Sequence, residues 1–322
     1  MNRRSLLFAA ASLGVAPAVR AQSPWPTRPT TIVVPYVPGG PSDILARTLA
    51  QQLNARLGQP FVVENRTGAN GAVAAQYVAR QPADGATLFI AASGIMTINP
   101  LLLARAGYDP IGDFTPITVA ISASNLMVVN PSVPANNLQE LIAWLRANPD
   151  KASYGSSGIG SSEHLGMELF KQVTGTEMTH VPYPGGGAAT TDLVGGTLQL
   201  ALLNMATVVP QVQAGRLRAI AVGGRTRHPL LPEVPTMVEA GLPDFTSGSW
   251  HSIVAPRGMA EPLATRIHDA VTAALRTPDV AQRLAATGFL VEASSRDGLT
   301  TTIETETARW RDVVRRAGLA AG

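Results

Sequence analysis

Apolar and polar positions alternate in two series of predicted strands and helices along most of the chain. The first series predicts strands at residues 31–36, 61–64 and 87–92 and helices at residues 42–56 and 70–80. The second series predicts strands at residues 126–130, 152–155, 178–183, 198–204 and 217–222 and helices at residues 138–147, 162–174, 188–194 and 206–214. Strands that alternate with helices form mostly parallel sheets, so the pattern predicts an α/β fold with two such units.

The first predicted helix has a single apolar face. Leu45, Leu49 and Leu53 recur every four residues, so they line one stripe that a sheet would bury. Ser42 precedes this stripe and stands where a helix N-cap is expected. We therefore expect a helix capped by Ser42 that packs against the first sheet.

The C-terminal part of the chain is mainly helical. Helices are predicted at residues 262–276, 278–287 and 297–317. A strand predicted at residues 249–255 would return the chain to the first sheet, which these helices would cover. The first domain is then discontinuous, and the chain crosses twice between domains. The expected division is residues 22–123 with 249–322 in one lobe and residues 124–248 in the other.

The N-terminus has the features of an export signal. Arg3 and Arg4 form a positive region, residues 5–19 are mostly apolar, and Ala21 ends a small-residue cleavage site. The apolar stretch is shorter than the ~20 residues of a membrane-spanning helix, although a short membrane anchor is the alternative. We therefore expect a signal peptide cleaved after Ala21 and an exported mature protein. The adjacent arginines leave open whether export follows the general or the twin-arginine route.

Charge and composition argue against several functional classes. The chain has 25 Lys and Arg against 22 Asp and Glu, and three of the basic residues lie in the first 21 positions, which leaves 22 of each sign. No basic run offers a surface for phosphates, so a nucleic-acid partner is not expected. There is no cysteine and no His-x-x-x-His pair, so we expect no metal site and no thiol chemistry. Glu163 replaces the third glycine of a dinucleotide fingerprint, so no cofactor is expected.

Three loops that follow predicted strands are rich in glycine and lack lysine and arginine. They span residues 38–43, 156–162 and 183–188, and each leads into a predicted helix. Glycine lets backbone N–H groups approach a ligand closely, and helix N-termini present unpaired N–H groups with partial positive charge. Such loops suit a carboxylate, although each alone also fits a tight turn with a serine cap. The loop residues expected to contact the ligand are Pro38, Gly39, Gly40, Asp43, Ser156, Ser157, Gly158, Gly160, Ser161, Tyr183, Gly185, Gly186, Gly187 and Ala188.

Several side chains near these loops have two possible roles. Asp43 either orients a donor group of the ligand or stabilises the helix N-terminus. His164 either donates to a ligand or is a capping or buried, hydrogen-bonded imidazole. Tyr36 and Trp250 either wall a cleft or belong to the core. The sequence leaves these alternatives open.

Enzyme motifs are mostly broken. No Gly-Lys pair exists, so there is no Walker A lysine, and residues 155–159 interrupt the G-x-S-x-G pattern. The alternative from another functional class is a secreted serine hydrolase, with Ser157 or Ser161 as nucleophile and His164 as base. Two serines and a histidine within one turn rarely present nucleophile, base and orienting acid together, so this alternative is disfavoured.

The order of several short motifs is more specific than any one of them. The motifs are PYVPGGPSD at residues 35–43, ENRTGANG at 64–71, YDPIGDF at 108–114, YGSSGIGS at 154–161, HVPYPG at 180–185, DLVGG at 192–196 and PEVPT at 232–236. In this order they resemble the Bug-type, TctC-like extracytoplasmic solute receptors of the tripartite tricarboxylate transporter family.

This resemblance implies a two-lobed periplasmic binding protein fold of type II, with no catalytic chemistry. The lobes would close around a small carboxylate and then dock to a membrane permease of two subunits. The resemblance also adds Ser93 and Asn99 to the residues that line the cleft, although an ordinary turn and a helix cap would equally explain them. We expect a monomer; a sensor that reports its liganded state to a signalling partner is the alternative role.

One position departs from the family pattern. Leu203, followed by Asn204, stands where the family often has an acidic residue. We include Asn204 among the residues expected to line the site. Because a buried ammonium group without a counter-charge is costly, this departure favours a plain or aromatic carboxylate over an amino acid.

Overall fold

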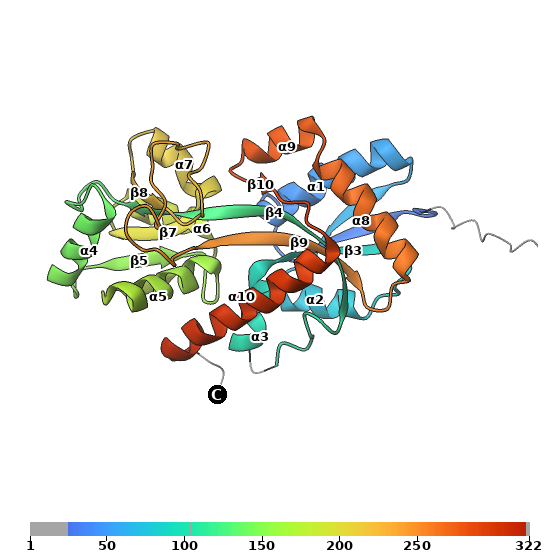
Figure 1. The fold of residues 1–322 in the computed structure, drawn as a ribbon, viewed down its shortest axis with the longest axis horizontal. Coiled ribbons are helices and arrows are strands. Elements are labelled where there is room, and N and C mark those ends of the chain that lie inside the picture. Colours follow the sequence, from blue (N-terminus) through green and yellow to red (C-terminus); the bar gives the residue numbers. More distant parts are fainter. Residues whose placement is uncertain (1–24, 104, 320–322) are drawn as a thin grey trace, which may run out of the picture.

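The structure, a computed structural model, describes residues 25–103 and 105–319, so the predicted signal peptide lies outside the described residues. The strands form one ten-stranded sheet with the order β2-β1-β3-β9-β4-β7-β5-β6, and β8 and β10 also pair with β4. Figure 1 shows the helices grouped around two halves of this sheet, with β4 and β9 running between them. The predicted two-lobed α/β fold is confirmed.

The first half contains three parallel strands, as the alternating pattern predicted. β1 (Thr30–Val34) pairs in parallel with β2 (Phe61–Asn65) and with β3 (Thr87–Ala92). α1 (Pro41–Leu57) connects β1 to β2, and α2 (Ala72–Ala79) connects β2 to β3. Parallel strands end at the same edge of a sheet, so the loops that follow them lie together.

The second half repeats this arrangement. β5 (Ser153–Ser156) pairs in parallel with β6 (Thr179–Pro182) and with β7 (Leu200–Asn204). The remaining elements are α4 (Leu138–Ala147), α5 (Ser162–Thr174), α6 (Gly186–Val194), α7 (Met205–Gln213) and β8 (Arg218–Val222). The loops after β5 and β6 therefore also lie at one edge.

Two long antiparallel strands join the halves. β4 (Phe114–Val129) has 16 residues; it pairs with β9 (Gly248–Pro256) through its first part and with β7 and β8 through its second. The sequence predicted only the end of β4, because Pro116 and alternating serines interrupt the apolar pattern earlier in the strand. The returning strand β9 was predicted correctly.

The C-terminal helices cover the first half, as predicted. These elements are α8 (Glu261–Leu275), α9 (Pro278–Ala285), β10 (Leu290–Val291) and α10 (Arg296–Arg316). Leu45, Leu49 and Leu53 of α1 are buried in one core cluster with Ile267 and Val271 of α8. Burial of such side chains contributes roughly 1.5–3 kcal/mol each.

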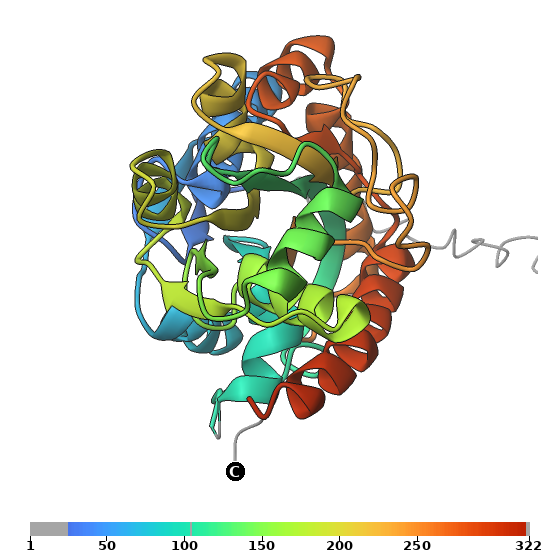
Figure 2. The ribbon, with the colours of Figure 1, turned by 90° about the vertical axis from the view of Figure 1, so that its left-hand side faces the viewer.

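The long helix α10 also contacts the second half. Trp310 and Val313 pack in one cluster with Ile98 of the first half and Leu165 of α5. Gln172 Nε2 donates to the Val313 carbonyl at 3.1 Å. Figure 2 shows α10 running along one side of the molecule. A helix therefore holds the halves together in addition to the crossing strands.

Two local expectations were wrong. α1 begins at Pro41 with Gly40 as its N-cap, and Ser42 caps nothing, because proline is favoured at the first helical position. The helix predicted at residues 70–80 is interrupted at its start: Ala69–Gly71 form a 3₁₀ turn, and the left-handed Gly71 (φ 86°) separates it from α2.

Candidate functional site

Each of the three glycine-rich loops follows the carboxyl end of a parallel strand. Residues 38–43 follow β1 in the first half, whereas residues 156–162 and 183–188 follow β5 and β6 in the second. A Cβ atom at Gly160 would lie 2.7 Å from Leu102 Cδ1 of the first half. The β5–α5 loop therefore contacts the first half directly.

Asp43 braces the β1–α1 loop from within. Its Oδ2 accepts the Gly39 N–H at 3.0 Å and Arg47 Nε at 2.8 Å. Its Oδ1 accepts Arg47 Nη2 at 3.0 Å and Asn65 Nδ2 at 3.1 Å. Burial opposes ionisation, but the hydrogen bonds from Arg47, Gly39 and Asn65 hold the pKa of Asp43 below its ordinary value. Both carboxylate oxygens are occupied, so of the two roles the structure favours stabilising the loop and the helix N-terminus.

The N-terminus of α1 has no side-chain cap. Gly40 is the N-cap residue, and no side chain bonds to the first-turn N–H groups. Ser42 is 1% exposed, and its hydroxyl has no hydrogen-bond partner among the described residues. A buried hydroxyl without a partner costs about 1–3 kcal/mol, so this helix end offers an unused polar group.

The N-terminus of α5, in contrast, is completed by the chain's own side chains. Ser161 is the N-cap, and its Oγ accepts the His164 N–H at 3.2 Å. Glu163 lies in the first turn, where its Oε2 accepts the hydroxyls of Ser157 at 2.8 Å and Ser162 at 3.3 Å. An acid in the first turn also interacts favourably with the helix dipole. The β5–α5 loop thus carries its own carboxylate.

A stack of three rings supports the β5–α5 loop. The His180 ring lies 4.8 Å from the Tyr154 ring and 4.0 Å from the His164 ring, measured between centroids. His180 Nε2 is hydrogen-bonded to Ser156 Oγ at 2.7 Å, and His164 Nδ1 accepts the Gly160 N–H at 3.2 Å. Burial lowers the pKa of His164 and of His180 to about 4, so both rings are neutral at neutral pH. Of the two roles for His164, the structure supports the buried, hydrogen-bonded one.

The N-terminus of α6 is open. Gly185 is its N-cap residue, no side chain caps it, and its first turn contains no acid. The N–H groups of Gly186, Gly187 and Ala188 have no partner among the described residues, and Gly187 and Ala188 are exposed. Tyr183 OH, just before this turn, donates to Asp192 Oδ2 at 2.6 Å. This helix end therefore has unpaired donors and an uncompensated partial positive charge.

An unpredicted π-helical turn positions Ser93 and Asn99. η2 (Gly94–Ile98) follows Ser93 after β3, and α3 (Asn99–Leu102) follows η2. Asn99 is buried; its Oδ1 accepts Asn70 Nδ2 and its Nδ2 donates to the Asn70 carbonyl, both at 3.0 Å. Asn99 therefore ties two loops of the first half together through its side chain, while its backbone forms the C-cap of η2.

Asn204 and Tyr36 lie on opposite sides of the junction between the halves. Asn204 caps α7, because its Oδ1 accepts the Ala206 N–H at 3.0 Å, and its Nδ2 donates to Ser249 Oγ at 3.3 Å. Burial, followed by the nearby Tyr108 and Glu163, raises the pKa of Tyr36 well above its ordinary value. Glu163 belongs to the second half, so its charge acts on Tyr36 across the junction between the halves.

The hydrolase alternative lacks the geometry that it needs. Ser157 donates to Glu163, and Ser161 accepts the backbone N–H of His164. The His164 ring itself accepts the Gly160 N–H. Neither proposed nucleophile is hydrogen-bonded to the ring of the proposed base, as nucleophilic activation requires.

Sequence reasoning missed three residues of this region. The sequence patterns explain Glu163 as a substitute for glycine, His180 as part of a motif and Ser42 as a helix cap, and predict none of the contacts that these side chains make. The signal for Glu163 was present: an acid two residues after a serine N-cap belongs to the first turn of a helix. The ring stack of His180 depends on contacts between separate strands, which no local pattern contains.

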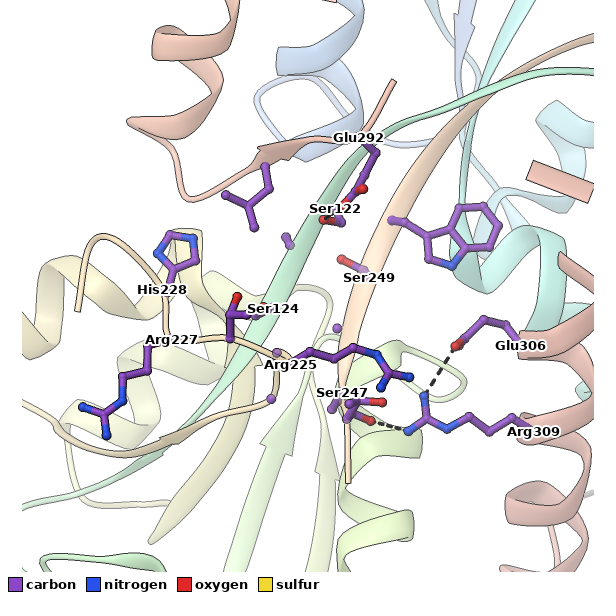
Figure 3. Close-up of a pocket in the computed structure, with 18 residues that line it drawn as sticks. Ser122, Ser124, Arg225, Arg227, His228, Ser247, Ser249, Glu292, Glu306 and Arg309 are labelled. Atoms are coloured by element: carbon purple, nitrogen blue, oxygen red, sulfur yellow. Dashed lines mark hydrogen bonds and ion pairs between the residues drawn. The ribbon is translucent and has the colours of Figure 1, made fainter. Parts of the chain in front are cut away.

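A separate cavity lies over the crossing strands. Its volume is about 320 Å³, and both halves contribute to its lining. Figure 3 shows Arg225 and Arg309 reaching toward each other there, and Arg309 Nη1 lies 3.4 Å from Glu306 Oε1. None of the loop residues predicted to contact a ligand lines it, so this cavity is separate from the three glycine-rich loops.

Residues 25–103 and 105–319 contain neither a membrane-spanning helix nor a cluster of metal-binding side chains. No helix in these ranges combines the length and the apolar character needed to cross a membrane. No three histidine, aspartate or glutamate side chains in the same ranges come together as a metal site.

Two α/β halves joined by the crossing strands β4 and β9 are the arrangement of a two-lobed periplasmic solute-binding receptor, and similar solved structures share it. A family model described as "Tripartite tricarboxylate transporter family receptor" (TctC) matches residues 45–319. The chain belongs to this family, as the order of its motifs predicted.

Individual relatives match along nearly the whole chain. BugT of Bordetella pertussis (strain Tohama I) is 34% identical over 309 residues, which cover 96% of this chain and 94% of the relative. The structure of R. palustris Rpa4515 with adipate has a TM-score of 0.84 and 40% identity, covering 92% of this chain and 99% of that one. MatC from Rhodopseudomonas palustris with bound malate has a TM-score of 0.79 and 34% identity, covering 90% and 99%.

Proposed function

We propose that this protein captures a small carboxylate between its lobes in the periplasm and delivers it to a tripartite tricarboxylate-type permease of two membrane subunits. The observation that carries this proposal is the open N-terminus of α6, which has three unpaired N–H groups and no acid in its first turn. Charge-assisted hydrogen bonds contribute roughly 1.5–3 kcal/mol each, so a few such donors support micromolar binding. Two similar structures are described with adipate and malate, both dicarboxylates.

The proposed ligand lies where the three glycine-rich loops meet. Its carboxylate accepts the N–H groups of α6 from Gly186 to Ala188 and contacts the uncapped start of α1. The loops after β1, β5 and β6, together with Tyr36, Ser93, Asn99 and Asn204, form the surrounding wall. Asp43, His164 and Asn99 hold the loops in shape through contacts within the protein.

The proposed motion is a change in the angle between two lobes. Residues 22–123 with 249–322 form one lobe and residues 124–248 the other, and β4 and β9 serve as the hinge between them. Irregular pairing of β4 with β9 at Pro116/Thr118 and Val119/Ile121 gives this strand pair places at which to bend. A ligand that contacts both lobes favours the closed state by its extra contacts there.

The mature protein in this proposal starts after Ala21, is a monomer and performs no chemistry on its ligand. The broken hydrolase geometry and the family's receptor role support the last point.

A thermal-shift panel tests the proposal. We expect adipate, malate or citrate to raise the unfolding temperature of the purified protein, because ligand at 100 times its dissociation constant stabilises by about 2.7 kcal/mol. Adipamide, which keeps the carbon skeleton but lacks charge, is the matched control and should have no effect. The proposal would be overturned if adipamide stabilised the protein as much as adipate does. It would also be overturned if none of the carboxylates raised the unfolding temperature.

A further inference from the structure

Glu163 is a buried acid without an ion pair. The residue is 8% exposed, and no basic side chain in residues 25–103 and 105–319 pairs with it. Its Oε2 accepts two serine hydroxyls, whereas its Oε1 has no donor among those residues. Two hydroxyl donors and the positive end of the α5 dipole offset part of the cost of burying this carboxylate, and a cation beside it would offset more.

The position of Glu163 places the acid at the junction between the halves. It lies in the first turn of α5, three residues after Gly160, whose backbone approaches Leu102 of the first half. Its charge also acts on Tyr36, which belongs to the first half. The side chain is therefore near the space that a ligand between the lobes would occupy.

The charge of Glu163 divides the site into two parts. A carboxylate placed at the start of α5 would be repelled by Glu163, whereas the start of α6 contains no acid. A cationic group is favoured at α5 and an anionic group at α6. Gly158 connects the two, since a Cβ atom there would lie 3.6 Å from the Tyr183 carbonyl.

We infer that the ligand is an amino-carboxylate, and that Glu163 selects it by pairing with its ammonium group while the α6 N–H groups hold its carboxylate. This inference rests on the proposed function. It replaces the expectation of a plain or aromatic carboxylate, which was based on Leu203 at a position where the family often has an acid. In this chain Glu163 of α5 supplies the acid instead. Glu163 is then a specificity-determining residue of this chain.

Matched ligand pairs test the inference by isothermal titration calorimetry. The pairs are succinate with aspartate, glutarate with glutamate, and adipate with 2-aminoadipate, which differ in each case only by an α-ammonium group. We expect the wild-type protein to bind the amino member of at least one pair ten times more tightly than its plain partner. Glu163→Gln keeps the size of the side chain and one acceptor oxygen. In this variant the affinity for the amino member should fall at least tenfold, while the affinity for the plain member should equal or exceed that of the wild-type protein.

Glu177→Gln is the control for loss of a negative charge, because Glu177 is an exposed acid in the same half. It should retain the preference for the amino member. A wild-type preference for the plain members, or an equal loss of both members in Glu163→Gln, would overturn the inference while the proposed carboxylate receptor stands. Binding of no member of any pair to the wild-type protein would overturn both.

Discussion

The N-termini of α5 and α6 follow neighbouring parallel strands and loops of similar composition, yet only the N-terminus of α5 is capped by side chains. Ser161 caps α5, and Glu163 supplies a carboxylate to its first turn. The first turn of α6 has neither a cap nor an acid. A glycine-rich loop before a helix is therefore not in itself an anion site. Such a loop can bind an anion only if no side chain of the protein already accepts the first-turn N–H groups and no nearby acid repels the anion.

Giving α6 an acid of its own should have the largest effect on binding. Ala188→Asp places a carboxylate at the third helical position, as Glu163 does near the start of α5. We expect carboxylate affinity to fall at least 100-fold, while the helix gains roughly 0.3–1 kcal/mol from the favourable dipole interaction. Calorimetry and thermal unfolding measure the two effects. Ala188→Asn has the same size without charge and should lose far less affinity; equal losses in both variants would refute the electrostatic explanation.

Substituting Gly160 should disturb the contact between the lobes. Its φ of 78° is unfavourable for other residues, and a Cβ atom would lie 2.7 Å from Leu102 Cδ1. We expect Gly160→Ala to lower the free energy of unfolding by about 2–3 kcal/mol and to weaken ligand binding about tenfold. Gly175→Ala is the control, because Gly175 also has positive φ but no atom within 4 Å of the added carbon. If both variants bind ligand equally well, the contact does not contribute to closure.

The ring stack under the β5–α5 loop makes stability depend on pH. The pKa of His164 and of His180 is about 4 in the folded state, against an ordinary 6.5, so the unfolded state takes up protons first. Stability should therefore be constant above pH 6.5 and fall as pH drops toward 4, with roughly 2 kcal/mol of the loss due to the stack after solvent screening and a further part due to the buried His251, whose pKa is also about 4. Denaturant unfolding from pH 7.5 to 4.5 measures this, and His164→Gln should reduce the slope. An unchanged slope would show that the stack is not the cause.

Removing the cap of α5 should have the smallest effect. Ser161→Ala loses the hydrogen bond to the His164 N–H, which should cost about 1 kcal/mol of stability. Affinity should change less than twofold, because the α6 donors remain. Ser295→Ala removes the equivalent cap of α10 and provides the reference for the loss of stability. A tenfold loss of affinity in Ser161→Ala alone would mean that α5 shares in holding the carboxylate.

The sequence contained most of the fold because the local patterns and the packing agree. The leucine stripe of α1 and the alternation of strands and helices are local features, and burial in the structure follows them. β4 was only partly predicted, because its crossing segment pairs on both edges and needs no continuous apolar run. In the candidate site, the glycine-rich composition predicted where the loops lie, but it did not predict which helix N-terminus carries an acid. The difference between α5 and α6 depends on one acid, Glu163, whose burial results from tertiary contacts.

The most direct test of the central claim is an NMR titration of protein with isotope-labelled glycine, using the carboxylate that binds most tightly. The Gly186 and Gly187 amide signals should move downfield as they donate to the ligand, with the same dissociation constant as calorimetry gives, while exposed Gly258 stays unchanged. Shifts at Gly158 and Gly160 with none at Gly186 and Gly187 would contradict the claim that the open helix end of α6 holds the carboxylate.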